Sequence, residues 1–222
     1  MNSNNGYVVV GSDTGIGKTE IACGIVRRLR IQGQRVGVFK PAASGLLGSS
    51  DDDIERLRDA TGGAFTADEI CPYRFALPVA PLIAADIAGK SIEWAVIWRA
   101  MQGWQTRCDQ LVVETAGGIY SPLDRLHSNL DFAQQLGLPA VVVVPNRLGA
   151  INSAMLVTAA LLAREIPIVR VFFNDLPHEE CDELIRRTNL ELFVELHQRY
   201  LRSERNIAAQ RISPGEVDAL LL

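Results

Sequence analysis

Lysine is scarce in this chain of 222 residues. Of its 22 basic residues only three are lysines, Lys18, Lys40 and Lys90, and the others are arginines. Because the chain uses arginine almost wherever it needs a cation, a position that keeps lysine's compact ammonium group is a candidate functional site. Lys90 lies in a short glycine-containing segment, where we expect it to be solvated. Lys18 and Lys40 are therefore the first candidates for functional cations.

Other absences exclude whole classes of protein. No apolar run approaches the roughly 20 residues of a membrane span, and the net charge of −4 argues against nucleic acid or an anionic membrane as the main partner. The four cysteines are widely spaced and form no C-x-x-C pair, so a disulfide framework or metal cluster is not indicated. The start lacks the pattern of a signal peptide. We expect a cytoplasmic protein with one domain over residues 1–222.

A glycine-rich loop runs from Gly11 to Thr19 and is a close variant of the phosphate-loop pattern G-x-x-x-x-G-K-[ST]. The variant is one residue longer than the strict pattern and carries an additional Gly15. An apolar run from Tyr7 to Val10 precedes it, and apolar residues at helical spacing follow from Glu20 to Arg30. A strand, a glycine loop and a helix start together favour phosphate binding, with backbone N–H groups around the phosphates. Lys18 is then expected at the outer phosphates and Thr19 at Mg²⁺.

Two further charged residues follow predicted strands. Lys40 follows the strand predicted from Arg35 to Phe39, and Glu114 lies near the end of the strand predicted to begin at Gln110. A strand, a helix and a second strand form a βαβ unit with parallel strands, so both side chains should lie at the edge that holds the phosphate loop. Glu114 suits a metal ligand or a water-positioning group. The alternative for each residue is a solvated charge that merely ends a strand.

Three adjacent aspartates, Asp51 to Asp53, precede an amphipathic stretch that begins at Ile54. They are either a helix cap or the source of a further Mg²⁺ ligand, and the local sequence favours neither. Farther along, a single helix is predicted over residues 92–107, and strands over residues 139–144 and 168–173. The alternation of strands and helices predicts an α/β fold with one doubly wound, mostly parallel sheet and helices on both faces. Residues 7–175 form its core, and residues 176–222 are expected to be mostly helical, with an uncertain course.

Five blocks occur in one order along the chain: the loop from Gly11 to Thr19, the Lys-Pro-x-x-Ser-Gly block at Lys40, a proline-rich block at residues 72–81, the block from Val113 to Gly118, and the block from Leu148 to Asn152. Together they resemble the dethiobiotin synthetase family of P-loop NTPases. The resemblance covers roughly residues 7 to 175. It implies an enzyme of biotin synthesis that uses ATP, Mg²⁺ and CO₂ to convert 7,8-diaminopelargonic acid into dethiobiotin.

The resemblance also implies roles for individual residues. Lys18, Lys40 and Thr14 would act on the transferring phosphoryl group, and Thr19, Asp53 and Glu114 would hold Mg²⁺. Nucleotide contacts would come from the loop and helix start and from one later residue: Asp13, Thr14, Gly15, Ile16, Gly17, Lys18, Thr19, Glu20 and, at the adenine base, Asn174. The small-molecule substrate would lie at the interface of a homodimer. Its contacts would be Ser44, Gly117, Gly118 and, from the partner, Leu148, Gly149, Ala150, Ile151 and Asn152.

The chain departs from the family pattern in two main places. Thr115 replaces a glycine after Glu114, and a β-branched residue there is expected to crowd a turn of positive φ. The late Gly-x-Ile-Pro strand with its nucleotide loop is not found in the sequence. The rival hypotheses are a related ATPase of the partitioning or metal-cluster-carrier group, and a non-catalytic nucleotide-binding descendant. The first usually has a lysine where this chain has Ser12, and Thr115 motivates the second.

Overall fold

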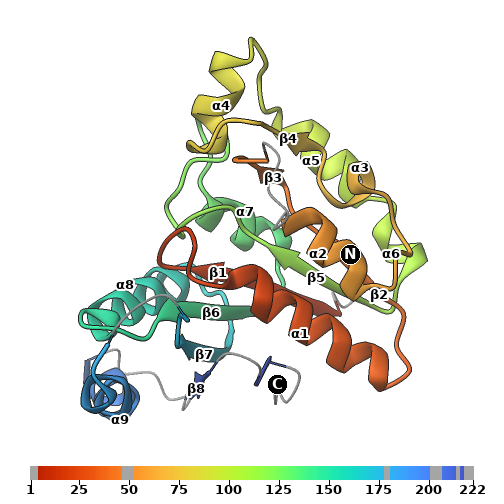
Figure 1. Ribbon diagram of the computed structural model, residues 1–222. Coiled ribbons are helices and arrows are strands. Elements are labelled where there is room, and N and C mark those ends of the chain that lie inside the picture. The colour runs from red at the N-terminus through yellow and green to blue at the C-terminus, as the bar shows by residue number, and fades with distance from the viewer. Residues whose placement is uncertain (1–4, 47–52, 178–180, 201–206, 214–215, 218–222) are drawn as a thin grey trace.

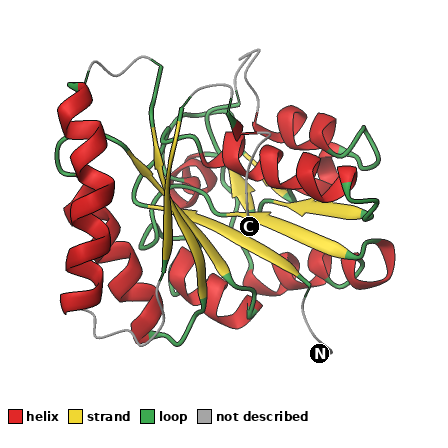
Figure 2. Cartoon of the chain, turned by 90° about the horizontal axis from the view of Figure 1, so that it is seen from below, coloured by secondary structure: helices red, strands yellow, loops and turns green. Residues whose placement is uncertain are grey.

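The computed structural model describes residues 5–46, 53–177, 181–200, 207–213 and 216–217. Its centre is a six-stranded sheet in the order β2-β5-β1-β6-β7-β8, in which every pairing is parallel. The strands of this sheet are β1 (Gly6–Gly11), β2 (Val36–Phe39), β5 (Gln110–Glu114), β6 (Ala140–Pro145), β7 (Ile168–Asn174) and β8 (Ala208–Ile212). Helices cover both faces (Figure 1, Figure 2). The predicted α/β class and doubly wound parallel sheet are confirmed.

Burial on both faces explains why the central strands read as unbroken apolar runs. Val8, Val9 and Val10 of β1 are fully buried, as are residues 140–144 of β6. A strand that is covered on both faces has no polar face to alternate with. The long helices α1 (Lys18–Ile31) and α8 (Ala150–Ala163) pack against this layer. Among the described residues, no helix combines the length and the apolar character that crossing a membrane requires.

The remaining helices are shorter, with one exception. They are α2 (Asp53–Ala60), α3 (Ala67–Ile70), α4 (Pro81–Ile87), α5 (Trp94–Met101), α6 (Trp104–Arg107), α7 (Asn129–Leu136) and the long α9 (Glu183–Tyr200). The prediction of one helix over residues 92–107 is wrong. The structure divides this segment into α5 and α6, because Gln102 ends the first helix and Gly103 precedes the second. Glycine is a poor residue inside a helix.

Two short strands lie outside the central sheet. β3 (Ala42–Ala43), just after Lys40, and β4 (Tyr73–Arg74), in the proline-rich block, pair as a small parallel sheet. Beyond residue 177, α9 confirms the expected helix. A late strand, which was not found in the sequence, is nevertheless present as β8. It pairs with β7, Asn174 aligning with Ile212. Only Ile212 of its residues is fully buried, which explains why periodicity did not indicate a strand.

Candidate active site

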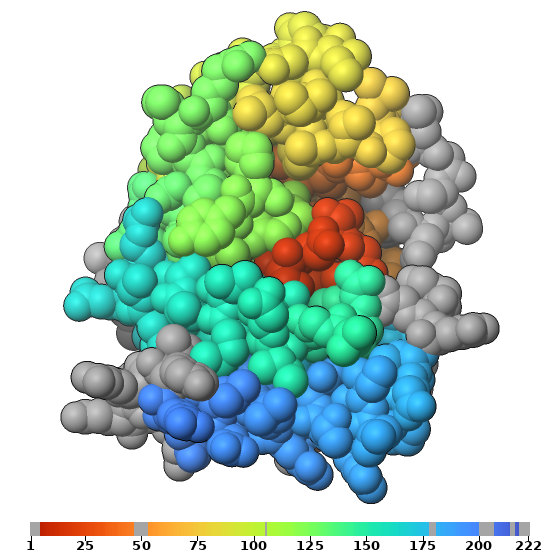
Figure 3. Space-filling view, turned by 90° about the vertical axis from the view of Figure 1, so that its left-hand side faces the viewer, coloured from red at the N-terminus to blue at the C-terminus, as the bar shows by residue number. Residues whose placement is uncertain are grey.

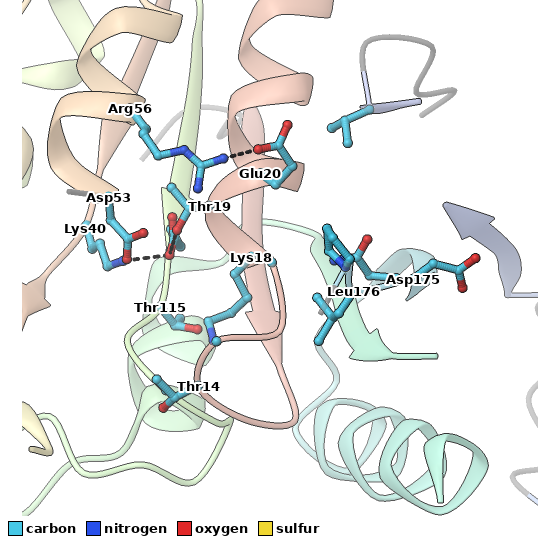
Figure 4. Close-up of a pocket in the computed structure, with 17 residues that line it drawn as sticks. Thr14, Lys18, Thr19, Glu20, Lys40, Asp53, Arg56, Thr115, Asp175 and Leu176 are labelled. Carbon is cyan, nitrogen blue, oxygen red and sulfur yellow. Dashed lines mark hydrogen bonds and ion pairs between the residues drawn. The ribbon is translucent and has the colours of Figure 1, made fainter. Parts of the chain in front are cut away.

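The carboxyl ends of four strands bring most of the candidate residues into one pocket of about 530 Å³. The phosphate loop follows β1, Lys40 follows β2, Glu114 ends β5 and Asn174 ends β7. Figure 4 shows side chains from these elements around the first turn of α1. The pocket is lined by Thr14, Gly15, Gly17, Lys18, Thr19, Glu20, Lys40, Asp53, Arg56, Glu114, Thr115, Gly117, Asn174, Asp175, Leu176, Pro177 and Val217.

The phosphate loop has the backbone that its glycines allow. Gly15 and Gly17 have φ of 71° and 85°, in the left-handed region that favours glycine. Gly17 is also the N-cap residue of α1, and no side chain caps the helix there. The first N–H groups of α1 are therefore not used by a capping side chain and are available to a ligand. This geometry suits a bound phosphate.

Asn174 holds the loop from behind. Its Nδ2 donates a hydrogen bond to the backbone oxygen of Ile16 at 3.0 Å. A Cβ atom on Gly17 would lie 2.1 Å from the same Nδ2, so the amide and the glycine fit each other closely. Asn174 thus reaches the phosphate loop from β7, 158 residues away. The bond fixes where its amide group sits at the pocket wall.

Lys18 has two features that suit a phosphate ligand. Its side chain is buried, and its Nζ donates to the backbone oxygen of Asp13 at 2.5 Å. Burial lowers the pKa of Lys18 to about 8, although the carboxylate of Glu114 acts in the opposite direction. The nearby carboxylates do not offset the effect of burial on this ammonium group, so an anionic ligand would stabilise its charged form. The fold thus prepares Lys18 for an incoming anion.

Lys40 lies between two carboxylates. Its Nζ donates to Glu114 Oε1 at 2.7 Å and to Asp53 Oδ2 at 2.5 Å. Burial lowers the pKa of Lys40, but Glu114 and Asp53 raise it more, so the group stays protonated at neutral pH. For Asp53, burial raises the pKa, and the nearby Lys40 lowers it below its usual value. Asp51 and Asp52, the two alternatives for the metal ligand, lie outside the described residues.

The oxygen groups expected to hold Mg²⁺ lie together. Thr19 Oγ1 donates to Glu114 Oε1 at 2.9 Å, and Thr19 also hydrogen-bonds Asp53. The other oxygen of Glu114, Oε2, is buried and has no hydrogen-bond partner among the described residues. A buried carboxylate oxygen without a partner suits a cation, and Mg²⁺ prefers carboxylate and hydroxyl oxygens. The three residues therefore fit the metal.

The turn after β5 is built tightly against the phosphate loop. Gly117 has a φ of 79°, and a Cβ on Gly118 would lie 2.7 Å from the backbone oxygen of Ser12. Asn129 of α7 is fully buried, and its Nδ2 donates to the backbone oxygens of Ala116 and Gly118 at 2.6 and 2.8 Å. The two glycines thus bring this turn against the loop. Asn129, which holds the turn, was not identified from the sequence.

The expectation for Thr115 is wrong. Its φ is not positive, since Glu165 is the residue other than glycine with positive φ among those described. Its side chain is fully buried, and Oγ1 donates to the backbone oxygen of Val9 at 3.2 Å, alongside the 3.0 Å bond from its own N–H. Thr115 therefore joins the end of β5 to β1 instead of crowding a turn.

Several predicted residues do not line the pocket. Asp13 and Ile16 belong to the loop, but the first is exposed and the second points its side chain into the core. Ser44 is half-buried outside the pocket, and the block from Leu148 to Asn152 covers the end of the turn after β6 and the first residues of α8. Figure 3 shows the phosphate loop, in red, at the surface, with the green segment near residue 120 and the blue-green segment near residue 145 beside it.

Sequence reasoning missed part of the pocket wall. Arg56 comes from α2, and Asp175, Leu176, Pro177 and Val217 come from the end of β7 and the segment after β8. Arg56 lies three residues after Asp53, a spacing that places both on one helix face and could have indicated it. Val217 carried no signal, because the strand before it was not predicted.

Comparisons with known proteins identify the family. A family model described as an AAA domain matches residues 5–206. An ATP-dependent dethiobiotin synthetase BioD from Anaeromyxobacter dehalogenans (strain 2CP-C) is 41% identical over 76% of this chain and 76% of its own. The same-named protein of Anaeromyxobacter sp. (strain Fw109-5) is 33% identical over 89% and 96%. That of Bacillus cereus (strain B4264) is 33% identical over 86% and 79%.

Solved structures agree on the fold alone. The hydrogenase maturation factor HypB from Archaeoglobus fulgidus has a TM-score of 0.53 and 15% identity, with 95% of this chain and 81% of that chain covered. The signal recognition particle receptor FtsY from Elizabethkingia anophelis, in complex with GDP, has a TM-score of 0.50 and 14% identity. This chain is covered completely there but spans only 61% of the FtsY chain. With its phosphate loop, its parallel sheet and these relatives, the chain belongs to the dethiobiotin synthetase family of P-loop NTPases.

Proposed function

We propose that the chain catalyses ATP-dependent formation of dethiobiotin from 7,8-diaminopelargonic acid and CO₂. One observation carries the proposal for the site. The chain belongs to this family, and its Lys18 and Lys40 line one pocket at the phosphate loop. The oxygen groups of Thr19, Asp53 and Glu114 line the same pocket. Phosphoryl transfer needs positioned charge rather than a covalent nucleophile, and this pocket supplies fixed cations and hydrogen-bond donors.

The reaction proceeds in three steps. One amine of the diamine attacks CO₂ and loses a proton, which gives a carbamate. A carbamate oxygen then attacks the γ-phosphorus of ATP, ADP leaves, and a mixed carbamic-phosphoric anhydride results. The second amine attacks the anhydride carbon, inorganic phosphate leaves and the ureido ring closes. Negative charge builds on the transferring oxygens in the second step, where Lys18 and Lys40 would act, with Thr14 on the exposed loop contacting phosphate or carbamate.

Thr19, Asp53 and Glu114 would hold Mg²⁺, and the unpartnered Oε2 of Glu114 supports this assignment. Bound there, the metal would supply Lewis-acid stabilisation of the phosphate oxygens. Lys40 hydrogen-bonds both carboxylates, so the residue that stabilises the transferring group also orients two of the three ligands. The ammonium group and the metal ligands would thus act as one charged unit.

The nucleotide would lie along the first turn of α1. Backbone N–H groups of residues 13–20 would surround its phosphates. At the other end of the pocket Leu176, Pro177 and Val217 offer an apolar wall beside Asn174, whose amide would contact the adenine base. Because Asn174 also bonds the backbone of Ile16, base and phosphate contacts would be coupled through one side chain.

We further propose a homodimer whose interface completes the site. The block from Leu148 to Asn152 does not line this chain's pocket, and Leu148 is 82% exposed. Gly149 caps α8 without a side-chain hydrogen bond, which leaves N–H groups for an anion. In the dimer these groups would bind the carboxylate of the partner's substrate. Ser44, Gly117 and Gly118 would contact the amine end.

A coupled assay tests the proposal. Phosphate release from MgATP and bicarbonate is measured with and without 7,8-diaminopelargonic acid, and the product is identified by mass. Release that requires the diamine and yields dethiobiotin supports the synthetase. Nucleotide binding without diamine-dependent release would favour the non-catalytic descendant. Thr115 motivated that alternative, but its backbone does not have the positive φ that would strain it.

A further inference from the structure

Arg56 is a third cation in the wall of the nucleotide pocket. It belongs to α2, which packs against α1, and it lines the pocket together with Lys18 and Thr19. Asp53, three residues earlier, faces the same pocket. Residues three apart on a helix share a face, so α2 presents a carboxylate and a guanidinium to the same space.

Glu20 holds the guanidinium above the first turn of α1. The Nη2 atom of Arg56 donates to Glu20 Oε2, and the other carboxylate oxygen of Glu20 lies 3.5 Å from Arg27 Nη2. Glu20 directly follows Thr19, so this ion pair lies beside the first turn of α1, whose N–H groups are available to phosphates. In Figure 4 Arg56 and Glu20 lie on the side of Thr19 away from Thr14.

The ion pair between Arg56 and Glu20 is more exposed than that between Lys40 and Glu114. The side chains of Lys40 and Glu114 are 5% and 2% exposed, whereas those of Arg56 and Glu20 are 34% and 38% exposed. An ion pair at this exposure is weak in water. A phosphate group carries more charge than one carboxylate and accepts two parallel hydrogen bonds from a planar guanidinium. A phosphate can therefore compete with Glu20 for the guanidinium of Arg56.

We propose that Arg56 binds a phosphate of the nucleotide beside the first turn of α1, and that Glu20 keeps it there when no nucleotide is bound. The inference rests on the proposed function only in that a nucleotide occupies this pocket. Arg56 lies away from Thr14, where the transferring group is expected. It should therefore strengthen nucleotide binding equally in the ground state and the transition state, which changes KM and leaves kcat unaltered.

Substitution by methionine removes the charge and keeps an unbranched stem. Calorimetric titration of Arg56→Met should show ADP affinity reduced about 10-fold, as for one charge-assisted hydrogen bond. Affinity for adenosine, which has no phosphate, should be unchanged. KM for ATP should rise by the same factor as the Kd of ADP, with kcat within about twofold. Arg56→Lys should recover part of the loss, because it keeps the charge without the fork.

Arg58→Met is the matched control. Arg58 lies on the same helix and has a similar ion pair, with Glu55 at 2.9 Å, but it does not line the pocket. Its ADP affinity should equal that of the wild type. Equal losses in both variants would attribute the effect to α2 packing and overturn the proposal.

The same substitution in a Glu20→Gln background tests whether repulsion by Glu20 explains a loss of ADP affinity. Without Arg56 the carboxylate of Glu20 would repel phosphate, and that repulsion alone could weaken binding. The double variant Glu20→Gln with Arg56→Met should still bind ADP about 10-fold more weakly than Glu20→Gln alone. Equal ADP affinities of the double variant and of Glu20→Gln would show that Arg56 does not contact the phosphate.

If the wild type binds ADP but releases no phosphate with the diamine, the synthetase proposal fails and Arg56 is still tested by ADP binding. If the wild type binds no ADP, both proposals fail.

Discussion

The Nζ atom of Lys40 lies 2.7 Å from Glu114 Oε1, and the two side chains are only 5% and 2% exposed. The sheet register causes this contact, because Phe39 of β2 pairs with Val113 of β5, which places the next residue of each strand side by side. A buried lysine between two carboxylates remains charged, and its compact ammonium group is a point charge whose geometry a planar guanidinium does not reproduce.

Lys40→Arg tests the fit of this cation. We expect kcat to fall about 100-fold, since a preorganised group aimed at developing charge is worth roughly that factor. The measurement is diamine-dependent phosphate release at saturating ATP, with ADP affinity determined separately. Because the charge is kept, the fold should tolerate the change, and circular dichroism supplies the control. Full activity in this variant would contradict the role given to Lys40.

Nucleotide affinity should fall at alkaline pH because of Lys18. Its pKa in the free protein is about 8, and bound phosphates stabilise the charged form and raise that value. Below pH 8 the free protein already carries the proton, so affinity is constant. Above pH 8 the proton must be taken up on binding, and ADP affinity should drop about tenfold per pH unit until the pKa of the complex is reached.

Calorimetry between pH 7.5 and 9.5, in buffers of different ionisation enthalpy, measures both the affinity and the proton uptake. Near pH 8 the uptake should be about half a proton. Lys18→Met should bind weakly at every pH and show no such slope. A wild-type affinity that stays flat to pH 9.5 would be inconsistent with the lowered pKa.

The sequence predicts the parts of this protein that local patterns encode. Central strands are recognisable because burial on both faces makes them apolar, and the glycine loop is recognisable by its residues. Lys40 and Glu114 could be assigned to one edge because parallel strands end together. Their direct hydrogen bond could not be predicted, because it depends on the strand order β2-β5-β1.

Residues whose role comes from a distant partner were not predictable. No local pattern around Arg211 of β8 indicates a function, yet its Nε donates a hydrogen bond to Asp175 Oδ2 at 2.8 Å. Asn129 can hydrogen-bond the backbone oxygen of Gly118 only because α7 places it beside that turn. The strand β8 itself forms through pairing with β7 rather than through its own composition. Such features depend on tertiary contacts, which outweigh local propensity.

Thr115→Val should separate stability from activity. The substitution keeps the volume and removes the hydrogen bond from Oγ1 to the backbone oxygen of Val9, while the bond from the Thr115 N–H remains. We expect a loss of about 1 kcal/mol in unfolding free energy, or a melting temperature lower by roughly 2–4 °C. The kcat should stay within about twofold. A large loss of kcat at unchanged stability would instead assign Thr115 to the reaction.

Leu148→Arg tests the proposed dimer. The leucine is exposed beside the uncapped start of α8, so a charge there should oppose association without disturbing the core. Light scattering should show a dimer for the wild type and a monomer for the variant, with KM for the diamine raised at least about tenfold. ADP affinity should persist. Ile31→Arg, at a similarly exposed position at the far end of α1, should leave both properties intact. A monomeric wild type would overturn the dimer.

Asp175→Asn should lower stability in a pH-dependent way. The carboxylate is buried and accepts hydrogen bonds from Asn146 at 2.7 Å and Arg211 at 2.8 Å. Burial raises the pKa of Asp175, but these hydrogen bonds and the two nearby arginines lower it to a net value below normal. The unfolded chain, with a pKa near 3.9, therefore binds the proton more readily. The stabilisation is complete above that value and is lost as the pH falls below it.

Denaturant unfolding from pH 7 to pH 3 should accordingly show a constant deficit of about 3 kcal/mol for Asp175→Asn down to roughly pH 5. Below about pH 4 the deficit should shrink by up to roughly 1.4 kcal/mol per pH unit, because the unfolded wild type then gains a proton that the folded carboxylate does not. Asp109→Asn is the matched control: its partner Arg35 also lowers the pKa of Asp109, but this pair is exposed and screened by solvent, so its loss should cost far less. A deficit for Asp175→Asn that persists unchanged at pH 3 would mean that packing, and not the charge of the carboxylate, joins β7 to β8.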